Sequence, residues 1–138
     1  MSNLADIIIR LICSYLLGSL SGAMIMGKIK GVDIRQSGSG NAGGTNAFRT
    51  QGAVFGLLVL CIDVIKGVLA VGLVSGTGGV PTALAIGCGV ACVLGHVFPI
   101  FYGFKGGKGA GTLIGVLAVL SPQAIACVLP VWLLVLIA

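Results

Sequence analysis

Residues 37–49, SGSGNAGGTNAFR, form a polar, glycine-rich stretch between two apolar segments that are each long enough to cross a lipid bilayer. The chain has 138 residues, a mean hydropathy of +1.18 and only 8% charged residues. Soluble domains of this length do not have such a composition. The sequence therefore predicts an integral membrane protein whose chemistry lies in the polar stretches.

Three apolar segments have the length of a transmembrane helix. Residues 7–27, 54–75 and 81–102 number 21, 22 and 22, and as helices each extends about 30 Å. From Ala110 onward Ser121 and Pro122 interrupt the apolar sequence, because proline ends or kinks a helix. We expect a short or re-entrant fourth span, a turn at residues 121–123 and a fifth span from Ala124, with one kinked helix as the alternative. The fold class is an all-α polytopic bundle of about five spans.

Basic residues orient this bundle. Six of the eight lysines and arginines lie in two loops that are separated by two spans: Lys28, Lys30, Arg35, Arg49, Lys105 and Lys108. The intervening loop, residues 76–80, has no charge. Because basic loops favour the cytoplasm, we expect the N-terminus outside and both basic loops inside. No cleavage pattern precedes Lys28, so the first segment is expected to remain in the protein.

Ionisable residues inside a span are costly and mark a site or an internal pair. Asp63 and Lys66 lie at i, i+3, so we expect an ion pair within the bundle, with a role in steering the basic loops as the alternative. The spans also contain five cysteines, of which Cys88 and Cys92 share a helix face. No histidine or carboxylate joins them at metal-ligand spacing, so we expect small apolar filler and no metal site.

Glycine pairs at GxxxG spacing recur along the chain, and this spacing lets helix backbones approach closely in lipid. The pairs are Gly18–Gly22, Gly52–Gly56 and Gly111–Gly115. They indicate a compact bundle.

Two nucleotide-binding patterns are excluded by their context. The GxGxxG match at residues 38–43 follows a predicted membrane helix and not a strand, and residues 103–109 lack the spacing of a Walker loop. The glycine N–H groups and the basic side chains of both loops could still bind an anion. The side chains that could hold a phosphate are those of Ser37, Ser39, Asn41, Thr45, Asn46, Arg49, Lys105 and Lys108. They fit a phosphorylated substrate, an anionic lipid head group or the cargo of an anion transporter, and residue chemistry leaves these open.

Residues 39–49 resemble the first signature of the bacterial acyl-phosphate:glycerol-3-phosphate acyltransferases, the PlsY family, whose pattern is S-G-N-x-G-x-T-N-x-x-R. Residues 95–112 resemble the second, G-H-x-x-P-x-x-x-x-F-K-G-G-K-G-x-A-T, with Gly111 where the family usually has alanine. The similarity runs in order from Tyr15 to Trp132. Family members continue with further spans and a third signature, so the resemblance implies a single transmembrane domain over residues 1–138 that is incomplete at its C-terminus.

The resemblance implies transfer of a fatty acyl group from acyl phosphate to the 1-hydroxyl of glycerol 3-phosphate, giving 1-acyl-glycerol 3-phosphate (lysophosphatidic acid) and phosphate in phospholipid synthesis. The residues implied in catalysis are Ser39, Asn41, Thr45, Asn46 and Arg49. Those implied in substrate binding are Gly40, Gly43, His96, Lys105, Gly106, Gly107 and Lys108. An anion or phosphate-ester transporter is the alternative function.

The resemblance also sets the partners and the location. The expected partners are acyl phosphate, glycerol 3-phosphate, membrane lipid and the enzyme that produces acyl phosphate. No cofactor, metal, acyl carrier protein, coenzyme A or nucleic acid is expected. The protein is expected in the bacterial inner membrane, crossing it several times, with its active site facing the cytoplasm.

Acyl phosphate is a mixed anhydride already activated for attack, so the protein needs chiefly to align two anions and offset their repulsion. A route through an acylated Ser39 needs a base, and His96 is the single histidine. His96 is either that base or a structural histidine that bonds a backbone carbonyl. We favour direct transfer without an acyl-enzyme, with a substrate phosphate oxygen as a further candidate for the base.

Overall fold

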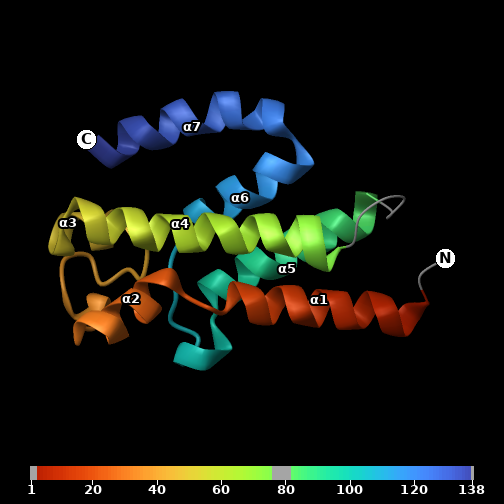
Figure 1. Cartoon of the computed structure of the whole chain (residues 1–138), viewed down its shortest axis with the longest axis horizontal. Coiled ribbons are helices and arrows are strands. Elements are labelled where there is room, and N and C mark those ends of the chain that lie inside the picture. The colour runs from red at the N-terminus through yellow and green to blue at the C-terminus, as the bar shows by residue number, and fades with distance from the viewer. Residues whose placement is uncertain (1–2, 76–81, 138) are drawn as a thin grey trace.

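The computed structural model describes residues 3–75 and 82–137 as an elongated bundle of helices (Figure 1). Every regular element in these ranges is helical, which confirms the all-α prediction. The elements are α1 (Leu4–Gly18), α2 (Gly22–Lys30), η1 (Ile34–Gln36), α3 (Gly44–Gln51), α4 (Ala53–Leu69), η2 (Ala70–Val74), α5 (Thr82–Val97), η3 (Ile100–Tyr102), α6 (Ala110–Leu120) and α7 (Pro122–Ile137). The uncharged loop at residues 76–80 and the start of the third predicted span lie outside the described residues.

The first predicted span is not one helix. The chain bends by 41° between α1 and α2. Ser19 ends α1, and its hydroxyl donates to the Tyr15 carbonyl at 2.9 Å. Ser21 is the N-cap of α2, and its Oγ accepts from the Met24 N–H at 3.4 Å. The two serines therefore cap the helix ends on either side of the break, and the prediction of an unbroken helix over residues 7–27 was wrong.

Two helical stretches, residues 53–74 and 82–102, are long and apolar enough to cross a membrane, and the bent α1–α2 pair is a third candidate. The second predicted span corresponds to α4, which continues as the π-helix η2, and the third to α5 and η3. Large apolar side chains project outward from α4 and α5: Val54, Leu57, Leu58, Ile65, Leu69, Ile86, Val90 and Leu94. Exposed apolar surface of this extent suits contact with lipid.

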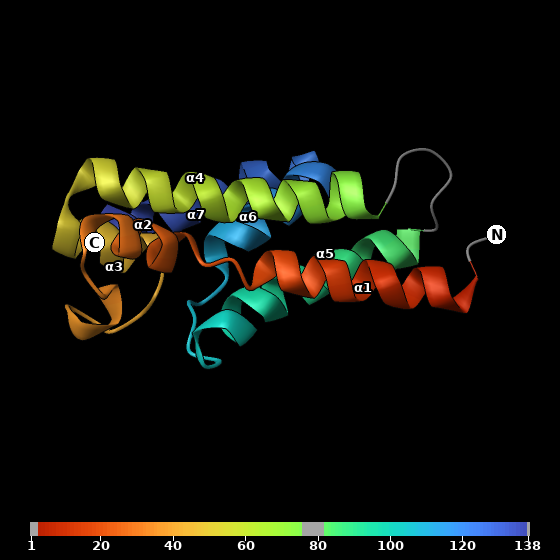
Figure 2. The ribbon, with the colours of Figure 1, turned by 60° about the horizontal axis from the view of Figure 1, so that its bottom comes forward.

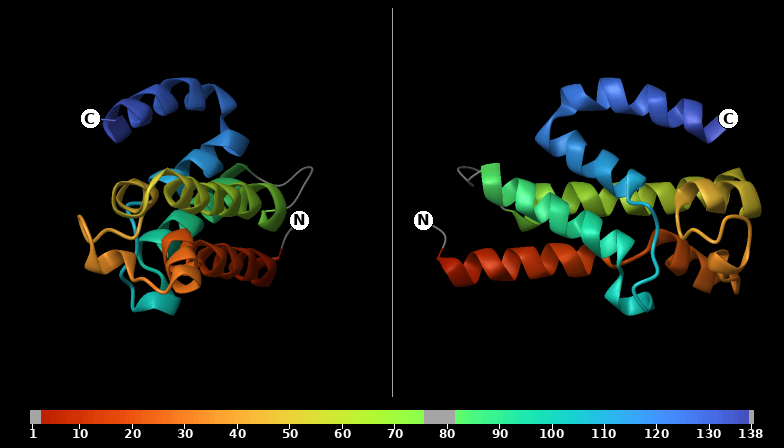
Figure 3. Two further views of the ribbon diagram at one scale, coloured as in Figure 1. Left: turned by 60° about the vertical axis from the view of Figure 1, so that its left-hand side comes forward. Right: turned by 180° about the vertical axis from the view of Figure 1, so that it is seen from behind.

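The last two helices form a hairpin. Helix α6 has 11 residues and corresponds to the short fourth span that was predicted, and α7 folds back beside it (Figures 1 and 3). The single kinked helix is therefore not observed. The turn is shorter than predicted, because α7 begins at Pro122 and not at Ala124. Proline suits a first helical position, where no N–H partner is needed.

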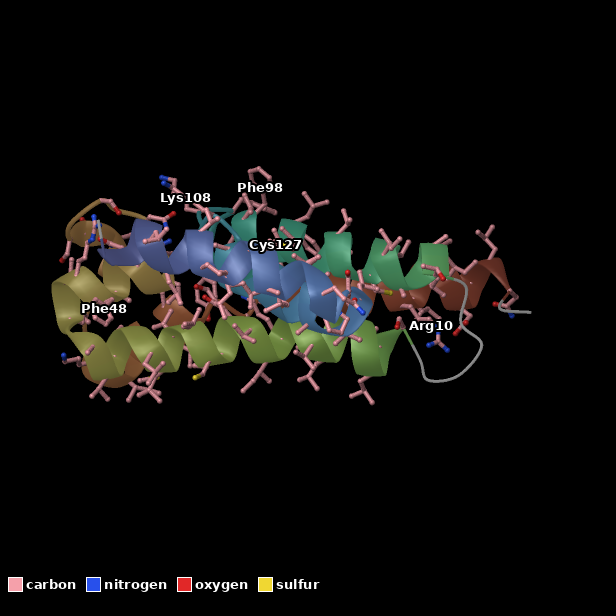
Figure 4. The ribbon with its side chains drawn as sticks, turned by 90° about the horizontal axis from the view of Figure 1, so that it is seen from above. Arg10, Phe48, Phe98, Lys108 and Cys127 are labelled. Carbon is pink, nitrogen blue, oxygen red and sulfur yellow. The ribbon has the colours of Figure 1, made fainter. Side chains whose placement is uncertain are left out.

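Helices α2 and α3 and the loop between them gather at the end of the bundle away from the N-terminus (Figure 2). Arg10 lies toward the opposite end from Phe48 and Lys108 (Figure 4). Part of the polar stretch predicted as a loop is helical, since α3 begins at Gly44. The small buried cluster of Ala23, Ile34, Ala42, Ala47, Phe55 and Val59 joins α2, α3 and α4 beneath this end.

Candidate active site

A cavity of about 500 Å³ lies between the polar stretch, α4, α5 and the start of α6. All five catalytic residues implied by the resemblance line it: Ser39, Asn41, Thr45, Asn46 and Arg49. Gly43, His96 and Lys108 line it as well. The polar stretch and the segment around His96 and Lys108, which are far apart in the sequence, thus line one cavity, as expected if the two signatures form one site.

Asn46 organises the polar stretch. Its buried amide nitrogen donates to the carbonyls of Ile34, Ser37 and Asn41 at 3.2, 3.0 and 3.1 Å. Its Oδ1 accepts from the Ser39 N–H at 3.0 Å. These bonds fix residues 37–41 in a tight loop, and they occupy the polar atoms of the Asn46 side chain. The contacts support a positioning part for Asn46, while its implied part in catalysis stays a prediction.

Glycines allow this loop to form. Gly38 and Gly40 have φ values of +59° and +72°, a region that side chains with Cβ atoms disfavour. At Gly38 a Cβ would also collide with the Asn46 side chain. Gly40 does not line the cavity, so its implied part in substrate binding has no support from its position.

The second basic loop folds back onto the end of α5. The Gly106 and Gly107 N–H groups donate to the carbonyls of Val97 and His96, each at 3.2 Å. A Cβ on Gly107 would collide with His96 Nε2 and lie 2.8 Å from the Ala42 carbonyl oxygen. These two glycines permit close packing of loop, helix and polar stretch, but they and the exposed Lys105 do not line the cavity.

Arg35 ties the two loops together. Its guanidinium bonds both carboxylate oxygens of Asp33, and its Nη1 donates to the Tyr102 carbonyl at 3.2 Å. The side-chain hydrogen bond from Arg35 is the largest cause that lowers the pKa of Asp33. The pair is therefore ionised at neutral pH, and the stability that it adds is lost as the pH falls through this lowered pKa.

The cavity carries excess positive charge. The chain has three acidic side chains, and each pairs with a basic one: Asp6 with Arg10, Asp33 with Arg35, and Asp63 with Lys66. Within the described residues, Arg49 and Lys108 at the cavity therefore have no carboxylate partner. Glycine N–H groups and cations of this kind suit a phosphate group.

The predicted ion pair of Asp63 and Lys66 is present at 2.9 Å and buried. The pair also stabilises the break between α1 and α2, because Lys66 Nζ donates to the carbonyls of Gly18 and Leu20, both at 2.9 Å. Asp63 Oδ1 accepts from the Gly22 N–H at 3.2 Å. Side chains thus satisfy backbone groups that the broken helix exposes.

His96 joins this pair. Its Nδ1 lies 2.9 Å from Lys66 Nζ and 3.4 Å from Asp63 Oδ1. A structural histidine was predicted to bond a backbone carbonyl, whereas His96 Nδ1 contacts both members of the ion pair. Asp63 itself lines the cavity, a position that was not predicted from the sequence, where the available signal was an ionisable pair inside a span.

No group of three or more histidine, cysteine or acidic side chains suitable for a metal occurs in residues 3–75 and 82–137. Cys88 and Cys92 are buried on α5, while Cys13, Cys61 and Cys127 face outward, and all five are free thiols. The positions fit the interpretation of the buried pair as apolar filler.

Comparison with known proteins gives the family. The family model described as glycerol-3-phosphate acyltransferase matches residues 8–138. The chain is 45% identical over 135 residues to a glycerol-3-phosphate acyltransferase of Chlorobaculum tepidum, covering 90% of this chain and 58% of the relative. It is 42% identical over 122 residues to that of Aquifex aeolicus, covering 88% and 64%. The chain thus spans about three fifths of the length of these relatives.

Two solved structures agree with this family assignment. The glycerol 3-phosphate form of PlsY (YgiH), an integral membrane glycerol 3-phosphate acyltransferase, matches with a TM-score of 0.86 and 39% identity, covering 95% of this chain and 66% of that one. The lysophosphatidic acid form matches with a TM-score of 0.82, covering 94% and 64%. These matches confirm a membrane-embedded helical fold and do not favour the transporter alternative. The chain belongs to the glycerol-3-phosphate acyltransferase family.

Proposed function

We propose that this chain carries the phosphate-binding part of a membrane enzyme that transfers a fatty acyl group from acyl phosphate to the 1-hydroxyl of glycerol 3-phosphate. The products are lysophosphatidic acid and phosphate. The observation that carries the proposal is the cavity where Arg49 and Lys108, from the two signatures, meet without a carboxylate partner among the described residues. The glycerol 3-phosphate and lysophosphatidic acid forms of PlsY support the acceptor and the product.

The proposed reaction does not require the protein to form a covalent intermediate. Both substrates carry a phosphate, and their repulsion must be offset before the hydroxyl reaches the acyl carbon. Arg49 supplies a forked donor set and Lys108 a mobile charge. Ser39 Oγ accepts from the Asn41 N–H at 3.4 Å, and no bond to His96 occurs within the described residues. This arrangement supports direct transfer without an acylated serine.

The cavity lies at the end of the bundle that holds the basic α2, α3 and the two loops (Figure 2). We place this end at the cytoplasmic face of the bacterial inner membrane, because basic loops are retained there. Lipid acyl chains would then lie alongside the outward apolar faces of α4 and α5. Direct contact with the enzyme that makes acyl phosphate is part of the same proposal.

The test uses an extended chain, defined here as residues 1–138 followed by the part of the Chlorobaculum tepidum relative beyond the matched residues. Purified in detergent, it should convert acyl phosphate and radiolabelled glycerol 3-phosphate to lysophosphatidic acid. Acyl coenzyme A should not replace acyl phosphate. Arg49→Ala in the same protein is the matched inactive control.

Two outcomes would contradict the proposal. Transfer from acyl coenzyme A at the same rate would refute the donor. Transport of glycerol 3-phosphate into proteoliposomes without any acylated product would restore the transporter alternative.

A further inference from the structure

The Asp63, Lys66 and His96 side chains form a buried polar cluster that contains the single histidine of the chain, and the inference drawn from it rests on the proposed function. Lys66 Nζ lies 2.9 Å from each of four groups: the Gly18 carbonyl, the Leu20 carbonyl, Asp63 Oδ1 and His96 Nδ1. An ammonium group has three donors and no acceptor. A carboxylate and two carbonyls surround the ammonium group, and these three acceptors match its three hydrogens.

One of these hydrogens must therefore be shared with His96 Nδ1, which is the acceptor in this contact because an ammonium nitrogen has no lone pair. A hydrogen on Nδ1 would face the ammonium hydrogens across 2.9 Å, whereas the Asp63 oxygen is farther away, at 3.4 Å. A doubly protonated ring would place two cations beside one carboxylate in a buried site. The favoured form is the neutral ring with its hydrogen on Nε2, because the bond made by one ring nitrogen fixes the state of the other.

The Nε2 edge is the part of the ring that remains for a ligand, because Nδ1 contacts Lys66 and Asp63. His96 lines the cavity, whereas Lys66 does not. Nε2 lies next to Gly107, where a Cβ would collide with it, and it has no hydrogen-bond partner within residues 3–75 and 82–137. The absence of a side chain at Gly107 keeps this edge open.

We propose that Lys66 holds His96 in the Nε2–H tautomer, so that His96 donates a hydrogen bond to an oxygen of the bound phosphorylated substrate and does not act as a general base. Lys66 is then a positioning residue that acts through His96. The proton of the attacking hydroxyl goes to another acceptor, for which a substrate phosphate oxygen is available in the proposed reaction.

The first test needs no catalysis. The 138-residue chain, labelled with ¹⁵N-histidine and solubilised in detergent micelles, gives one pair of ring nitrogen signals because it has one histidine. Nε2 should have the shift of a protonated nitrogen and Nδ1 that of an unprotonated one. Glycerol 3-phosphate should move the Nε2 signal more than the Nδ1 signal. Protonation of Nδ1, or no response of Nε2 at saturating ligand, would overturn the proposal.

A lysine variant tests the cause of the tautomer. Lys66→Met should allow Nδ1–H to form and bond Asp63, while Lys28→Met, on the exposed surface of α2, should leave the ring signals unchanged. Retention of the Nε2–H form in folded Lys66→Met would show that Lys66 does not set it. If that variant does not fold, the signals of the unmodified chain still decide the tautomer.

Two histidine variants in the extended chain separate a donor from a base. Glutamine can place an N–H close to the Nε2 position but cannot accept a proton, and alanine has neither ability. His96→Ala should lower kcat about 10²- to 10³-fold, the usual effect of removing one preorganised donor, and His96→Gln should recover at least about a tenth of the original kcat. Equal losses in both variants would favour a base and overturn the proposal. Absence of acyl transfer in the unmodified extended chain would refute the proposed function. The tautomer would then be decided by the ¹⁵N signals of the His96 ring alone.

Discussion

The contact between α4 and α6 predicts the effect of a single methyl group at Gly115. A Cβ there would collide with the Val64 carbonyl oxygen and lie 2.9 Å from the Val64 carbonyl carbon and 3.0 Å from the Val68 nitrogen. All three atoms belong to the backbone, so no side chain can rotate away and the helices must separate. Overpacking of this kind costs about 1–3 kcal/mol.

The matched control is Gly72→Ala. Nothing lies within 4 Å of a Cβ at Gly72, which is also helical. Alanine gains about 1 kcal/mol over glycine in an α-helix interior such as that of Gly115, and we expect a gain of the same sign at Gly72 in the π-helix η2. The difference between them isolates the steric cost, so we expect Gly115→Ala to be less stable than Gly72→Ala by about 1–3 kcal/mol.

Reversible unfolding in mixed detergent micelles, followed by circular dichroism, measures this difference. Gly115→Ala should also reduce turnover of the extended chain, because α6 begins at Ala110, which lines the cavity with Gly111. Equal stability of the two variants, within about 0.5 kcal/mol, would refute the steric argument.

Three further predictions concern the cavity and its orientation. Arg49→Lys in the extended chain should lose most of its kcat, because lysine cannot reproduce a forked phosphate contact; wild-type kinetics would contradict this. Lys108→Ala should raise the KM for glycerol 3-phosphate more than Lys105→Ala does, since only Lys108 lines the cavity, and equal effects would remove that distinction. Single cysteines at the exposed Gln36 and Lys105, in a cysteine-free chain, should react in intact cells only with membrane-permeant reagents; labelling by an impermeant reagent would reverse the orientation.

Composition and hydrophobic segment length were sufficient to predict the helical membrane fold, because apolar segments of about 20 residues are typical of transmembrane helices. They could not predict the break after Gly18. Serines such as Ser19 and Ser21, which cap its two sides, are common inside membrane helices, and the groups that stabilise the break come from Lys66 and Asp63 on another helix. A tertiary contact of this kind leaves only an indirect trace in the sequence, namely a charged pair within an apolar span.

For the site, the two signatures correctly indicated which loops would meet, but not which of their residues would face the cavity. Lys105 and Lys108 are equivalent by spacing and charge, and their different positions follow from the fold of the loop onto α5. Similarly, nothing local shows that the Asn46 amide bonds three carbonyls of its own loop. Motif membership therefore identifies a neighbourhood, and hydrogen bonding determines the part that each residue plays in it.

The buried ion pair also has an electrostatic consequence for the site. Asp63 lines the cavity, and an isolated carboxylate there would repel a phosphate. Its neighbour Lys66, at 2.9 Å, offsets that charge within the bundle, so the charges of Arg49 and Lys108 remain available to the ligand. The same two side chains satisfy the backbone of the broken helix. Loss of Lys66 should therefore weaken phosphate binding even without a contact between Lys66 and the ligand, because it would leave Asp63 as an uncompensated negative charge on the cavity wall.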